Sequence, residues 1–145
     1  MIKNNKGVTL VELLIVIVIL GIIAAISIPA VGGIVENSRK DAVLADATTV
    51  RNAANLYCVS EECLVGQILT ADELSAYISG FEGTYQVEVG SRATNTYRVA
   101  ILSGDYGFVG NPLGDVNRGW VVAATSVTLE TGDPLADFPE DTDPS

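Results

Sequence analysis

The apolar positions of this chain follow three patterns, and each pattern predicts a different element. From Val8 to Val35 the chain is almost continuously apolar, with Glu12 as its only charged residue. The two stretches "TYQVEV" and "TYRVAIL" alternate apolar and polar residues, as half-buried strands do. Between these regions, apolar residues recur at alternating intervals of four and three, the spacing of one helix face: Val43, Ala47, Val50, Ala54 and Tyr57.

Together these patterns predict one long helix followed by a small sheet. The two helical patterns join into a helix of about fifty residues from Val8 to Tyr57, about 75 Å long. A short helix is expected in "TADELSAYI", with Thr70 as N-cap and Glu73 at the capping-box spacing. At least one more strand is expected in "GWVVAATSVTL". The predicted fold class is therefore α+β, with an antiparallel sheet packed on the second half of the long helix.

The continuous apolar segment is long enough to cross a membrane. Its 28 residues extend about 42 Å as a helix, against roughly 30 Å of bilayer hydrocarbon. Lys3 and Lys6 precede the segment, while Arg39 and Lys40 follow it. The distribution of basic residues therefore leans only slightly towards a cytoplasmic N-terminus.

Glu12 is the residue of this segment that requires an explanation. A carboxylate in hydrocarbon is costly, and such a residue usually has a function and a partner. A secretory signal peptide has no use for an acid at the head of its apolar core, and the nearest cleavage sequence, "ISIPA", places Ile28 where a small residue is required. A plain anchor helix leaves Glu12 equally unexplained. Both alternatives are weakened by this one residue.

Composition narrows the classes of function. The net charge is −10, so the surface at large repels phosphate backbones and no direct nucleic-acid binding is expected. The chain has no histidine, no glycine-rich phosphate loop and no CxxC pair. We therefore expect neither an enzyme nor a cofactor. Residues 130–145 carry six acidic and no basic residues, which predicts a poorly ordered, solvated tail.

Cys58 and Cys63 are the only cysteines of the chain. In an exported domain, such a close pair predicts a local disulfide, with two unrelated buried thiols as the alternative. Positions five apart on an intact helix do not face each other, so a bridge implies that the long helix ends near Cys58.

The segment "SGDYGFVGNPLGDVNRG" is rich in glycine and is predicted to be a long turn. It contains four side chains with oxygen ligands: Asp105, Asn111, Asp115 and Asn117. These are weak candidates for calcium, because their spacing does not match an EF-hand loop. We predict no metal site.

The N-terminal region resembles the N-terminus of type IV pilins and pilin-like proteins. The resemblance is carried by Lys6-Gly7, an apolar residue, Thr9-Leu10, Glu12 and the long apolar run, and it covers roughly the first 55 residues. It implies that a prepilin peptidase cleaves between Gly7 and Val8 and that Val8 is then N-methylated. Val8 departs from the commonest residue of the family at this position, which is Phe. Glu12 becomes the fifth mature residue, where it would guide filament assembly by meeting the Val8 amine of a neighbouring subunit.

The resemblance also implies a domain organisation. Residues 1–7 form the leader, 8–35 the membrane and assembly half of the helix, 36–129 the pilin head, and 130–145 the acidic tail. Gly21 and Pro29 match recurring family positions in the apolar helix. They are its soft points, since glycine lowers helix propensity and proline removes a helix hydrogen bond. The stretch between them is expected to be able to lose helicity as subunits pack.

The function implied is that of a structural pilin subunit with a role in adhesion, twitching motility or DNA uptake. Its partners would be other pilin subunits, the prepilin peptidase and an assembly platform in the membrane. The chain would lie in the cytoplasmic membrane as a prepilin and then at the cell surface in a pilus. Two alternatives remain open: a pseudopilin of a type II secretion system or competence pilus, and a membrane-anchored binding module.

Overall fold

The computed structural model describes residues 7–90, 96–114, 116–127, 129 and 141–144. Their regular elements are one long helix, one short helix, two single-turn 3-10 helices and a five-stranded antiparallel sheet. The chain divides into two compact units, Met1–Asn37 and Ser38–Ser145. The α+β class predicted from the sequence is confirmed.

The long helix α1 spans Leu10–Ser60, so its first part belongs to the first unit and the remainder to the second. The continuous helix expected from the two apolar patterns is therefore present; it begins two residues later and ends three residues later than expected. Pro29 lies inside it. The different patterns along one helix already indicate that its two parts have different surroundings.

The sheet lies entirely in the second unit. Its strands, in the spatial order in which they also follow one another along the chain, are β1 (Ile68–Thr70), β2 (Thr84–Val89), β3 (Tyr97–Ser103), β4 (Tyr106–Gly110) and β5 (Val122–Ala123). All neighbours pair antiparallel; in the central pair, for example, Val87 lies opposite Val99. The alternation in "TYQVEV" and "TYRVAIL" therefore identified β2 and β3 correctly.

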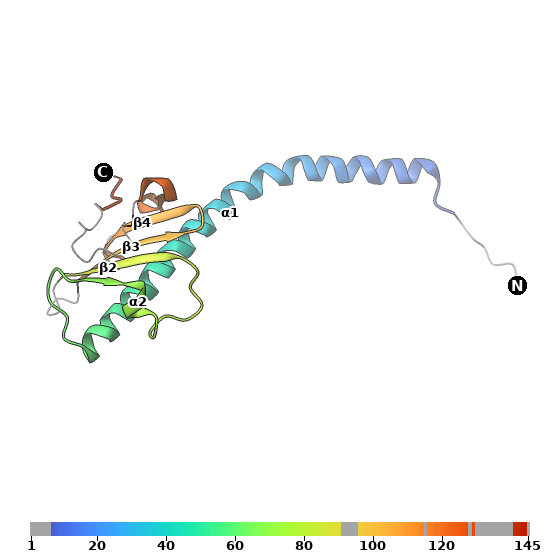
Figure 1. Cartoon of the computed structure of the whole chain (residues 1–145). Coiled ribbons are helices and arrows are strands. Elements are labelled where there is room, and N and C mark those ends of the chain that lie inside the picture. Colours follow the sequence, from blue (N-terminus) through green and yellow to red (C-terminus); the bar gives the residue numbers. More distant parts are fainter. Residues whose placement is uncertain (1–6, 91–95, 115, 128, 130–140, 145) are drawn as a thin grey trace, which may run out of the picture. The chain divides into compact units, whose positions relative to one another are not determined.

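The core of the second unit lies between the sheet and the second part of α1, which β2, β3 and β4 cross in Figure 1. Four of the five residues of the predicted helix stripe are buried: Val43, Ala47, Val50 and Ala54. The fifth, Tyr57, is half-buried and packs against the core, while the adjacent Cys58 is fully buried. Ala47 and Ala54 are wholly inaccessible. Such small side chains let the sheet approach the helix closely.

The sheet residues that pack in the core with α1 are the apolar positions of the alternating pattern, Tyr85, Val87, Val89, Tyr97, Val99 and Ile101, together with Phe108 of β4. A second, smaller cluster forms on the opposite face from Ala100, Val109 and Val127. Because both faces of the middle strands are covered, Ala100 is buried as deeply as Ile101. The strict in-and-out alternation expected for these strands thus holds for the helix-facing side only.

The prediction of a long turn in residues 103–119 is wrong for its first half, because Tyr106–Gly110 form β4. Ser103 and Tyr106 pair across a two-residue turn whose first residue, Gly104, has a φ of +59°. This conformation favours glycine, and a Gly-Asp pair between two strands is a recognised hairpin signal. Glycines at 104, 107 and 110 obscured the alternation.

Other boundaries also differ from the predictions. β1 (Ile68–Thr70) was not predicted, and the short helix α2 covers only Ala71–Leu74. In place of a longer last strand, β5 is two residues long and is followed by a 3-10 turn at Ala124–Ser126. Asp141 and Thr142 are hydrogen-bonded to β3 and β4, which the expectation of a solvated tail did not include. Residues 130–140 and 145 lie outside the described residues.

Candidate assembly site

The first part of α1 presents apolar side chains on all sides. Its most apolar window has a mean hydropathy of 3.0, and none of that window is buried within the chain. By length and composition α1 is able to cross a membrane. A helix that is apolar all round is typical of a membrane span or of a helix surrounded by other apolar surfaces.

Glu12 lies in the first turn of α1 and is bound by the residue at the helix start. The Thr9 backbone N–H donates to Glu12 Oε2 at 2.8 Å, and the Thr9 hydroxyl donates to the same oxygen at 3.0 Å. The Glu12 N–H donates to Thr9 Oγ1 at 3.3 Å, and the Leu13 N–H donates to the Thr9 carbonyl at 3.2 Å. This is a capping box, with Thr9 as N-cap.

The capping box explains where α1 begins. Thr9 and Glu12 satisfy N–H groups that the first turn of a helix otherwise leaves unpaired. The Thr-x-x-Glu spacing at Thr9 is the same as the one that predicted a capping box at Thr70, but no such box was predicted at Thr9. The carboxylate is also favoured at this place because the N-terminus of a helix carries a partial positive charge.

The two residues of the expected cleavage site lie just before the helix. Gly7 and Val8 have no regular secondary structure, and the side chain of Val8 is 76% exposed. The peptide bond between them is therefore outside the hydrogen-bonded helix and accessible. The leader residues 1–6 lie outside the described residues.

Gly21 and Pro29, the expected soft points, both lie within α1. A Cβ at Gly21 would meet no atom within 4 Å, so packing inside the chain does not require glycine there. Proline has no N–H to donate to the preceding turn. Two residues earlier, the Ser27 hydroxyl donates to the Ile23 carbonyl at 2.8 Å, an additional bond to the helix backbone near the proline. Loss of helicity in this stretch stays a prediction.

Cys58 and Cys63 are joined as a disulfide, with their Cα atoms 5.2 Å apart. Cys58 lies in the last turn of α1, and both cysteines are buried. The bridge closes the loop that leads from α1 towards β1. It lies in the second unit and belongs to the core of the head.

The structure does not bring the calcium candidates together. Asp105 and Asn111 lie at opposite ends of β4, about 20 Å apart at the usual rise of a strand. The amides of Asn111 and Asn117 accept local bonds from the N–H groups of Leu113 and Gly119. Asp115 lies outside the described residues. Among those that are described, no group of three or more His, Cys, Asp or Glu side chains is arranged to hold a metal.

Ion pairs that the sequence did not predict join parts of the head. The Arg118 guanidinium binds both oxygens of Asp41 at 2.6 Å, connecting the turn before β5 to α1. These hydrogen bonds hold the pKa of the Asp41 carboxyl below its usual range. Asp46 shows the opposite effect: its partial burial raises its pKa, although the Ser103 hydroxyl lies 3.5 Å away.

Comparisons with known proteins agree with the motif at the start of the chain. Residues 2–28 match the family described as "Prokaryotic N-terminal methylation motif". Two proteins of Dichelobacter nodosus, each named "Fimbrial protein", are 35% identical to this chain over 115 residues. The alignment covers 78% of this chain and 62% of each relative, so the chain spans less than two thirds of their length. Among solved structures, none matches the chain.

The motif, the long apolar helix and the sheet on its second part thus all agree with the similarity to fimbrial proteins. The N-terminal methylation motif and the similarity to fimbrial proteins support assignment of this chain to the type IV pilin and pilin-like family.

Proposed function

We propose that this chain is a structural subunit of a type IV or type IV-like pilus, which polymerises through the first part of α1. The observation that carries the proposal is the contrast within one helix. The second part of α1 is covered by its own sheet, whereas the apolar window of the first part is completely uncovered. Lipid covers such a surface before assembly, and the same part of other copies covers it in a filament.

Glu12 gives this helix contact a defined register. Within the described part of the chain, both bonds that Glu12 accepts fall on Oε2, which leaves Oε1 available to a donor from another copy. Cleavage before Val8 would create a positively charged amine at the start of each helix. An unpaired carboxylate at the centre of a span costs about 2.5–3.5 kcal/mol on insertion scales, and less near the interface. Pairing of Oε1 with the amine of a neighbour would remove that cost at one axial position only.

The helix start also suits the proposed processing. Because Thr9 caps α1, the bond between Gly7 and Val8 lies outside the helix, and Val8 is exposed. A peptidase needs an accessible, non-helical backbone around the bond that it cleaves. The prepilin peptidase of the membrane is the proposed enzyme, and methylation of the new Val8 amine would follow cleavage.

The test is mass spectrometry of the N-terminus of chains from sheared surface filaments. We expect a mature chain that begins at Val8 and carries one methyl group on its α-amine. Chains that retain residues 1–7 in such filaments would contradict the proposal. An unprocessed chain that never forms filaments would instead support the membrane-anchored binding module. Processed chains restricted to short periplasmic assemblies would favour the pseudopilin.

A further inference from the structure

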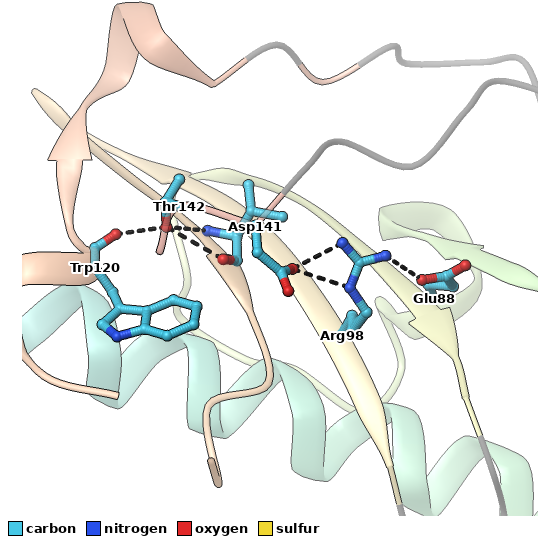
Figure 2. A network of polar contacts seen from close by, with 6 residues as sticks. Glu88, Arg98, Trp120, Asp141 and Thr142 are labelled. Atoms are coloured by element: carbon cyan, nitrogen blue, oxygen red, sulfur yellow. Dashed lines mark hydrogen bonds and ion pairs between the residues drawn. The ribbon is translucent and has the colours of Figure 1, made fainter. Parts of the chain in front are cut away.

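The end of the chain is fastened to the sheet by a charged network around Arg98 in β3. Figure 2 shows the guanidinium of Arg98 between the carboxylates of Asp141 and Glu88. Its Nε and Nη2 donate to Asp141 Oδ1 at 3.0 and 2.7 Å, while Nη1 donates to Glu88 Oε2 at 2.7 Å. Glu88 lies directly opposite Arg98 on the neighbouring strand β2. One side chain of the central strand therefore holds both its cross-strand partner and the C-terminal segment.

The next residue of this segment, Thr142, pairs with the backbone of β4. The Val109 N–H donates to Thr142 Oγ1 at 3.0 Å, and the Thr142 N–H donates to the Val109 carbonyl at 2.9 Å. The Thr142 hydroxyl donates to the carbonyl of Trp120, which lies in the turn before β5 (Figure 2). One threonine thus satisfies both backbone groups of Val109 and ties two segments together.

These bonds occupy a part of β4 that β5 leaves open. β5 pairs with β4 only at Tyr106 and Gly107. Beyond that point, the outward N–H and C=O of Val109 would form an exposed strand edge. An exposed edge is a template for pairing with a strand of another chain. Thr142 occupies this position. Pro144, two residues further along, lies close to Gly119, because a Cβ added to Gly119 would be 3.4 Å from the proline ring. Proline has no N–H, so it cannot extend the pairing.

We propose that residues 141–144 form a latch that closes the β4 edge against strand pairing between copies of this chain. Arg98 holds the latch through Asp141, and Thr142 occupies the backbone groups of Val109. The latch joins three places that are distant in sequence: β3, β4 and the turn that contains Trp120. When it opens, the bare edge of β4 becomes an acceptor for the corresponding strand of a second copy. The inference does not depend on filament formation through α1.

The test uses the full chain in detergent micelles and compares amide hydrogen exchange at Val109 by NMR. The double variant Arg98→Gln/Thr142→Val removes the side-chain attachments of the latch and keeps the backbone bond from the residue 142 N–H to the Val109 carbonyl. We expect exchange of the Val109 amide to become at least tenfold faster, with the central β3 amides unchanged. The matched control is Arg118→Gln, which removes another bidentate Arg–Asp pair of the head, that with Asp41.

Equal acceleration at Val109 in the control would mean general loosening and would overturn the proposal. So would unchanged exchange in the double variant, because the edge would then be protected without the latch.

A second measurement follows pairing between copies, in a Glu12→Ala background that removes the proposed α1 contact. We expect sedimentation to show at least a threefold larger dimer fraction when the latch is opened, and no increase with Arg118→Gln. A monomer of unchanged sedimentation, despite fast exchange at Val109, would refute strand pairing. Failure of the pilus proposal would leave both measurements interpretable, since neither requires filaments.

Discussion

The chain contains the same hydrogen-bonded motif twice, in two different surroundings. At the start of α1, the Thr9 N–H and hydroxyl donate to Glu12 at 2.8 and 3.0 Å. At the start of α2, the corresponding groups of Thr70 donate to Glu73 at 2.8 and 3.2 Å. The box at Thr70 is followed by Leu74, which is buried in the core, whereas the one at Thr9 is followed by an apolar helix surface that no described residue of the chain covers.

The comparison teaches that local chemistry alone does not give a residue its role. Both glutamates cap a helix, and capping by itself is worth about 1 kcal/mol. In the second unit that energy adds to the stability of a folded head. In the first unit, the Glu12 carboxylate lies in a segment that we propose is covered by lipid or by other helices, where an acid without a further partner is costly. The two capping boxes therefore differ in the surroundings of their glutamates, and substitutions at the two places should have different effects.

The largest expected effect separates the two glutamates. Glu12→Ala should reduce filaments in the sheared surface fraction at least tenfold, because the carboxylate proposed to pair with the amine of a neighbouring copy is lost, while the chain remains in the membrane. Glu73→Ala, the matched control, should leave filament yield unchanged and lower only the melting temperature of the head. Immunoblots of the sheared and membrane fractions measure both. Normal filament yield with Glu12→Ala would break the comparison.

The disulfide provides the next largest effect, confined to the second unit. Cys58 and Cys63 are five positions apart, and loss of so short a loop constraint should cost about 2 kcal/mol. We expect the double variant Cys58→Ala/Cys63→Ala to unfold at a lower denaturant concentration and to insert into the membrane normally. Urea unfolding of the full chain in detergent, with and without reductant, checks this. A reductant effect that persists in the variant would show that the stabilisation has another source.

Substitutions of the two threonines should have smaller effects, which again differ between the two capping boxes. Thr→Val removes the hydroxyl of each box but keeps the backbone N–H that binds the glutamate. Thr70→Val should destabilise the head by about 1 kcal/mol and lower its melting temperature by roughly 4–8 °C. Thr9→Val should leave that temperature unchanged and reduce filament yield only severalfold, since one bond to Glu12 remains. Calorimetry and filament yield together distinguish the two; identical behaviour of both variants would contradict the difference in surroundings.

The smallest effects concern pH and belong to the head alone. The pKa of Asp41 is lowered by the hydrogen bonds from Arg118, so its contribution to stability is present above the unfolded pKa and lost as pH falls through the folded value. The pKa of Asp46 is raised by burial, so ionised Asp46 opposes folding at neutral pH.

At pH 7, Asp41→Asn should therefore lower the melting temperature slightly, and Asp46→Asn should raise it slightly. In acid, below both the folded and the unfolded pKa of each group, both differences should disappear, because each carboxyl is then protonated in both states. Melting curves of both variants between pH 7 and pH 3 measure this. Shifts of the same sign at pH 7 would show that the two carboxyls do not differ as described.

The sequence predicted those elements whose signal is local and repetitive. The apolar run gave α1, and the alternation gave β2 and β3, because in each case a single face or a whole segment is buried in one kind of environment. β4 was missed, since Gly107 and Gly110 provide no side chain to mark a face. Thr9 was missed as the partner of Glu12, although the spacing was visible. In the acidic tail, Asp141 and Thr142 were expected to be solvated because their partners, Arg98 and Val109, are more than thirty positions away.

The sequence by itself determined the long helix and its motif at Gly7, Val8 and Glu12, which lie within the match to the N-terminal methylation family, since these depend on neighbours along the chain. Only the tertiary structure decided which residues close the sheet. The pairing of Thr142 with Val109, the clamp of Arg98 on Asp141 and the pair of Arg118 with Asp41 join distant segments. Such contacts form only where the fold brings complementary groups within hydrogen-bonding distance, and no local pattern records that distance.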